Sequence, residues 1–189
     1  MITESDYYDH YKDTFEQQKG YLKERNRLTL YLVLIVSVIF LLSSNRVLIM
    51  DVSSVIQKQK IGKIIVDFNI ITSALYFAFL WISMRYYQIT LTIEKTYTYI
   101  AKCEKVMSAT GEFKIDREGG DYEKNYPWLK WLAHRIYVII FPLLIVIASI
   151  VTIVQECGLD KTNRLLNIIF LTLVILLSLL YMVNRFFGK

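Results

Sequence analysis

Residues 28–44 read LTLYLVLIVSVIFLLSS, a run that contains no charged side chain. A bilayer core about 30 Å thick needs roughly 20 mostly apolar residues in one helical span. Because a segment that crosses lipid must satisfy its own backbone hydrogen bonds, this run predicts a membrane-spanning helix. The stretch before it is long and charged, and no small-residue cleavage site follows it. We therefore interpret the run as a retained anchor and not as a cleaved signal peptide.

Three further apolar blocks follow, at residues 64–84, 136–154 and 165–183. Strongly polar stretches separate them, although 54% of the chain is hydrophobic. The blocks are apolar on all faces, whereas the strands of a membrane barrel are shorter and alternate in polarity. The sequence therefore predicts an all-α membrane protein with four transmembrane helices.

The distribution of basic residues predicts the orientation of these helices. Sixteen of the 22 lysines and arginines fall in residues 1–27, 85–135 and 184–189, and six fall in the two remaining loops. Because the more basic side faces the cytoplasm, both termini and the segment 85–135 are expected there. Acidic residues are interleaved with the basic ones, so direct nucleic-acid binding is not expected.

Residues 1–27 form the first predicted cytoplasmic element. Tyr8, Tyr11, Phe15 and Leu22 recur at helical spacing, and Gln18 occupies the one polar position of the series. This pattern predicts an amphipathic helix that leads into the first span. Its aromatic face is expected to rest on the membrane surface or on another helix.

The segment after residue 84 predicts a helical stalk that continues the second span. Apolar and small residues recur there at alternating spacings of four and three, which is typical of a helical seam: Ile82, Tyr86, Ile89, Ile93, Thr96, Ile100, Cys103 and Met107. The runs ITLTI (89–93) and TYTYI (96–100) also alternate as a strand would. We favour the helix because the seam is unbroken. The stalk is expected to pack against the N-terminal helix or against copies of itself.

Residues 108–128 predict a short hairpin or an ordered loop, since glycines punctuate the stretch. Its charged turn suggests a site that docks a partner, with Arg117, Glu118, Asp121 and Tyr122 as candidates, although a solvated turn would look the same. Pro127 then starts a short helix in which Trp128 and Trp131 are predicted to anchor the chain at the headgroup level.

Few polar residues fall inside the predicted spans. Asp67 and Asn69 lie early in the second span, and Asn167 lies early in the fourth. A polar or acidic residue in a span suggests a pore or gating role, although Asp67 is near enough to the boundary to reach water. Pro142 is expected to free a backbone carbonyl in the third span.

The sequence contains no recognisable catalytic or metal-binding signature. His10 and His134 are the only histidines, and no phosphate-binding glycine loop or nucleophile elbow is present. Cys103 and Cys157 fall on opposite sides of the predicted membrane, so they cannot pair within one chain. We expect no enzyme activity, no metal and no cofactor.

The layout of helices, together with REGGDYEKNYP at residues 117–127, resembles small four-span membrane proteins of bacterial anti-phage defence systems, such as the Kiwa membrane subunit. That resemblance implies a homo-oligomeric sensor or effector subunit of the bacterial inner membrane that binds a cytoplasmic protein. The alternative is a small oligomeric ion channel or depolarising pore. A third possibility is a structural accessory to another membrane protein.

Overall fold

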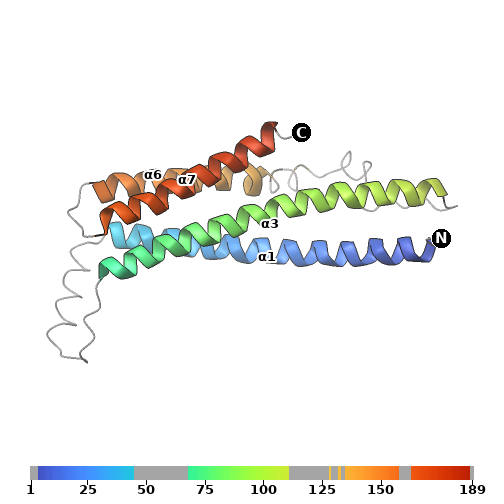
Figure 1. The fold of residues 1–189 in the computed structure, drawn as a ribbon, viewed down its shortest axis with the longest axis horizontal. Helices are drawn as coiled ribbons and strands as arrows, with labels where there is room; N and C mark the ends of the chain where they lie inside the picture. Colours follow the sequence, from blue (N-terminus) through green and yellow to red (C-terminus); the bar gives the residue numbers. More distant parts are fainter. Residues whose placement is uncertain are drawn as a thin grey trace, which may run out of the picture. The chain divides into compact units, whose positions relative to one another are not determined.

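The computed structural model describes residues 4–44, 68–110, 128, 132, 135–157 and 163–187. The longest elements are the helices α1 (Glu4–Ser44) and α3 (Phe68–Thr110), each more than 40 residues long. The π-helix η1 (Ile136–Ile140) leads into α6 (Phe141–Cys157), and α7 (Arg164–Phe187) follows (Figure 1). The described part of the chain contains no strand, so its fold is all-helical.

The helical interpretation of residues 85–110 is confirmed, because α3 runs without interruption through both runs that alternate like strands. The N-terminal helix and the first apolar run are likewise one element, α1. The predicted hairpin or loop covers residues 108–128; residues 108–110 belong instead to α3, and residues 111–127 lie outside the described residues.

Contacts divide the chain into two units. The stalk unit comprises Met1–Leu28 and Tyr86–Ile140, and the apolar unit comprises Thr29–Arg85 and Phe141–Lys189. The helices α1 and α3 contribute residues to both units.

In the stalk unit, the first half of α1 lies beside the second half of α3 and runs in the opposite direction (Figure 1). Tyr11, Ile100 and Met107 form a buried cluster, and Phe15 and Cys103 pack against it. The stalk thus packs against the N-terminal helix of its own chain, which is one of the two arrangements that the sequence left open.

In the apolar unit, α6 and α7 pack side by side. Their buried residues recur at alternating spacings of three and four, as in helices that interlock along a seam; they are Pro142, Ile145, Ser149, Thr152 and Glu156 in α6 and Asn167, Leu171, Val174, Ser178 and Tyr181 in α7. The small hydroxyl residues in these seams bond to carbonyls of their own helices, as Ser149 does to Ile145 at 2.8 Å. Their polar groups are therefore satisfied without water.

Three helices are long and apolar enough to cross a membrane, namely Tyr8–Leu42, Ile136–Cys157 and Arg164–Phe187. They cover residues 28–42 of the predicted span 28–44 and all of the predicted spans 136–154 and 165–183, and the last two extend beyond their predicted ends. This is compatible with a multi-pass membrane protein. The predicted span 64–84 is not among the three, and its first residues lie outside the described part of the chain.

Candidate functional site

A carboxylate lies buried near the end of α6. Glu156 is only 3% exposed. The hydroxyl of Tyr76 in α3 donates a hydrogen bond to its Oε1 at 3.2 Å, and the side-chain amide of Asn167 in α7 donates to its Oε2 at 3.2 Å. Both carboxylate oxygens therefore have a donor, as a buried acid requires.

Ser73 of α3 completes this arrangement. Its Oγ lies 2.7 Å from Oδ1 of Asn167 and 2.9 Å from the carbonyl oxygen of Asn69. The single hydroxyl proton of Ser73 is thus shared between two acceptors. We call Ser73, Tyr76, Glu156 and Asn167 the buried polar network.

The buried polar network links three helices of the apolar unit. All four of its side chains are buried, and Asn167 has no exposed surface. Polar groups in an apolar interior are costly unless they are mutually hydrogen-bonded, so one alignment of α3, α6 and α7 satisfies the whole set. Chemically, the network can fix helix register, and it can change conformation only by breaking several hydrogen bonds together.

Sequence reasoning missed Glu156, because the third span was predicted to end at residue 154 and the acid was assigned to the loop beyond. The signal that could have found it is the polar series Ser149, Thr152 and Glu156, whose spacing of three and four places it on one helix face. Of the predicted pore residues, Asp67 lies outside the described residues. Asn69 is half-buried and contributes its carbonyl to the edge of the network.

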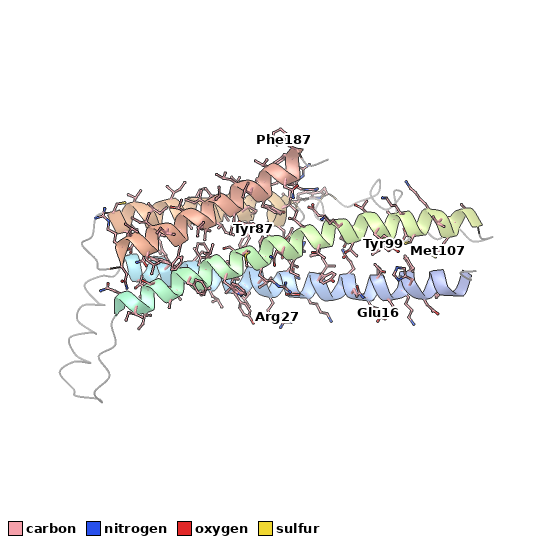
Figure 2. All side chains as sticks on the ribbon, in the orientation of Figure 1. Glu16, Arg27, Tyr87, Tyr99, Met107 and Phe187 are labelled. Carbon is pink, nitrogen blue, oxygen red and sulfur yellow. The ribbon has the colours of Figure 1, made fainter. Side chains whose placement is uncertain are left out.

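Most of the predicted stalk seam is buried in the stalk unit, namely Tyr86, Ile89, Ile93, Ile100 and Met107, whereas Thr96 and Cys103 are half-buried. Polar contacts also cross between α1 and α3 in this unit. The Tyr11 hydroxyl donates to Glu104 Oε1 at 3.0 Å, and the Gln18 amide donates to the Ile93 carbonyl at 3.2 Å. On the exposed edge, His10 Nε2 lies 2.8 Å from the Tyr99 hydroxyl. Figure 2 labels Tyr99 and Met107 on this part of α3.

Gln18 and Glu104 are buried polar residues in an otherwise apolar seam. The Oε1 atom of Gln18 accepts no hydrogen bond from the described residues. A buried polar residue in a helical seam costs stability but favours one register over its alternatives. These two residues therefore specify how α1 and α3 align in the stalk unit.

Tyr137 of η1 is held from two sides within the stalk unit. The Arg25 guanidinium of α1 lies 4.3 Å from the centre of its ring, and the Tyr86 hydroxyl of α3 donates to its carbonyl at 2.6 Å. In a π-helix that carbonyl would accept from residue 142, which is a proline without an N–H. Tyr86 thus supplies the donor that Pro142 lacks, in line with the freed carbonyl that the sequence predicts.

Most of the remaining predicted site residues lie outside the part of the chain that the structure describes. Trp131 lies outside the described residues, as do the four docking candidates Arg117, Glu118, Asp121 and Tyr122. Trp128 is described and is 74% exposed. No cluster of three or more His, Cys, Asp or Glu side chains suited to a metal ion occurs among the residues that the structure describes.

Comparison with protein-family models found no match to this chain. Comparisons with curated proteins and with solved structures also found none.

Proposed function

We propose that this chain is a membrane-embedded, oligomeric sensor or effector subunit that docks a cytoplasmic protein partner. The observation that carries the proposal is a change of surface along α1. Its first half exposes charged side chains such as Lys12 and Glu16, and its second half exposes Leu34 and Phe40. A helix with both surfaces suits a protein that stands in lipid and extends into water.

The first half of α3 supports a fourth span. Ile70, Phe77 and Trp81 are exposed on it, and Arg85 follows on the same side of the helix at a spacing of four. An exposed apolar stripe that ends at a cation is typical of a membrane helix at its interface with water.

Arginines at the ends of the exposed apolar stripes support a cytoplasmic location for both termini. Arg27 precedes the apolar stripe of α1, Arg135 precedes that of η1 and α6, and Arg185 lies in the last turn of α7. In four helices that alternate in direction, these ends and Arg85 share one side. Under the rule that basic residues face inward, that side is the cytoplasm.

Docking of a partner is proposed for the segment 111–135, because the seam of the stalk unit is already occupied by its own α1. The charged turn with Arg117, Glu118, Asp121 and Tyr122 remains the candidate surface. The resemblance to anti-phage defence proteins favours the bacterial inner membrane as the location and a homo-oligomer as the assembly.

The two native cysteines test the proposed topology. Cys103 belongs to the stalk unit and Cys157 to the apolar unit, and both are free thiols. In spheroplasts, a membrane-impermeant maleimide should label the C103S variant, which keeps Cys157. It should label the C157S variant only after permeabilisation. Labelling in detergent controls for the half-buried state of Cys103. The reverse pattern would overturn the orientation.

Docking is tested by native mass spectrometry of the gently solubilised protein, expressed with its neighbouring genes. We expect a homo-oligomer that carries a soluble protein, and we expect R117E/D121K to lose that protein while keeping the oligomer. The matched control is K102E, which changes an exposed cation of α3. Loss of the partner in K102E alone would move the docking surface to the stalk helices.

The alternative function is a small oligomeric ion channel, which the polar residues near one end of the apolar unit favour. A channel should depolarise cells when it is overexpressed, and D67A and E156Q should change the ion flux in liposomes. A docking subunit should leave the membrane potential unchanged in the absence of its partner.

A further inference from the structure

The arginines of this chain are not spread evenly along the described helices. All six that the structure describes, at positions 25, 27, 85, 135, 164 and 185, lie within a few residues of the places where exposed apolar stripes begin or end. Farther from these places, the cations of the described stalk helices are the lysines at positions 12, 19, 95, 102 and 105. The rule for membrane orientation counts both residue types alike, so it does not explain this segregation.

The guanidinium group differs from an ammonium group in the ligand that it fits. It presents a planar fork of N–H donors that binds a phosphate through two parallel hydrogen bonds, whereas lysine acts as a point charge. Arginines that gather where a charged surface meets an apolar one therefore point to a phosphate at that level.

One face of α1 carries exposed cations and, directly after them along the helix, exposed apolar side chains. Lys23 and Arg27 are exposed one turn apart, and Leu30 and Leu34 follow them at helical spacing and are also exposed. Figure 2 labels Arg27 on this helix. Two cations followed by an apolar stripe match a phospholipid, which carries a phosphate above its acyl chains. A water-soluble acidic partner would match the charge but not the stripe.

In a second element of the stalk unit, η1, a cation is also followed by exposed apolar side chains, and a side-chain contact fixes the position of this element along α1. Arg135 is exposed, and Ile136 and Ile140 follow it with exposed apolar surface. Tyr137 lies against Arg25 of α1, two residues before Arg27. The contact therefore aligns the level of Arg135 with that of Arg27 along the axis of α1.

We propose that Lys23, Arg27 and Arg135 bind the phosphate groups of anionic phospholipids in the adjoining leaflet. The contact between Arg25 and Tyr137 positions the two binding elements at one height. The inference rests on the proposed membrane location, and it names the lipid class that the protein selects.

The test is native mass spectrometry of the full chain released from nanodiscs made of equal parts phosphatidylglycerol and phosphatidylcholine. The wild type should retain phosphatidylglycerol preferentially. R27Q/R135Q should lose about fivefold of that preference for each arginine, since each cation near an anionic surface contributes on the order of 1 kcal/mol. R27K/R135K should fall between the two. The matched control K12Q/K105Q removes two exposed lysines of the same unit and should behave like the wild type.

An unchanged preference in R27Q/R135Q would overturn the proposal, and so would an equal loss in K12Q/K105Q. Loss of a co-purified protein with the lipid retained would also overturn it, because the surface would then be a protein interface. If R27Q/R135Q does not fold, the exposed single variant R27Q provides the same measurement. Release of the wild type from membranes by alkaline carbonate would instead refute the proposed membrane location. Firm retention without lipid preference would refute this inference alone.

Discussion

In the stalk unit the buried cluster is apolar, built from Tyr11, Ile100 and Met107, and exposed positions of α1 such as Lys12 and Glu16 are charged. Both units bury polar residues among apolar ones, Gln18 and Glu104 in the stalk unit and Glu156 and Asn167 in the apolar unit. The outside differs, because large aliphatic side chains cover the apolar unit. Both units are built from helices with the same seam spacing. The spacing therefore determines which side of a helix is buried. The residues outside the seam determine whether the surface of the unit suits water or lipid.

The largest expected effect breaks the seam of the stalk unit. We expect Ile100→Ala to destabilise the helix pair by roughly 2–5 kcal/mol, because the side chain is fully buried in the cluster with Tyr11 and Met107. Hydrogen exchange of the full chain in nanodiscs should show amides of residues 86–110 exchanging about 30-fold faster or more. Val106→Ala, at an exposed position of the same helix, is the control and should exchange like the wild type.

A second prediction compares the outer surfaces of the two units. Leu34 is 54% exposed in the apolar unit, and Val106 is 49% exposed in the stalk unit. Leu34→Asp should disfavour membrane insertion by about 3 kcal/mol, because an acid at that position would face lipid. Val106→Asp should leave insertion and stability unchanged, because the proposed function places this exposed position in water. The fraction of protein that stays in the membrane after carbonate extraction measures insertion for both variants. Equal behaviour of the two variants would contradict the contrast between the units.

The buried polar network gives a smaller expected effect. Glu156→Ala leaves Tyr76 and Asn167 without their acceptor and should cost roughly 1–3 kcal/mol, measured by thermal unfolding in detergent. Glu156→Gln keeps one oxygen acceptor and should cost less. Glu16→Ala removes an exposed acid of the stalk unit and is the control. If Glu156→Ala were as stable as the control, the network would not hold α3, α6 and α7 together.

The smallest effect is expected at the π-helix. Tyr86→Phe removes the hydroxyl that donates to the Tyr137 carbonyl and should cost about 1 kcal/mol in thermal unfolding. Tyr31→Phe, which changes an exposed tyrosine of α1, should have no measurable effect. An unchanged melting temperature for Tyr86→Phe would mean that water serves the carbonyl equally well.

Much of the helical architecture could be predicted because it depends on local spacing. The run at residues 28–44 lies in a helix long and apolar enough to span a membrane, and the stalk seam predicts the buried positions Ile89, Ile93, Ile100 and Met107. The helical interpretation prevailed over the strand because the apolar positions keep their three-and-four spacing through the β-branched runs.

The buried polar network could not be predicted, because its members are far apart in the sequence. Ser73 and Asn167 are separated by 94 positions, and hydropathy alone assigns Glu156 to a loop. Periodicity shows which face of a helix is buried but not which residue meets it. The same limit applies to Tyr86 and Tyr137, where Pro142 predicts a freed carbonyl but not its donor.

Tyr11 and its partner Glu104 are 93 positions apart in the chain, and this separation determines the time between their synthesis. At a synthesis rate of about 5–20 residues per second, roughly 5–19 seconds pass between the emergence of the two partners. During this interval the aromatic face of α1 is available to a chaperone or to the nearby bilayer surface. Residues 28–44 emerge within the same interval. In the proposed membrane location, they can therefore insert before the stalk closes.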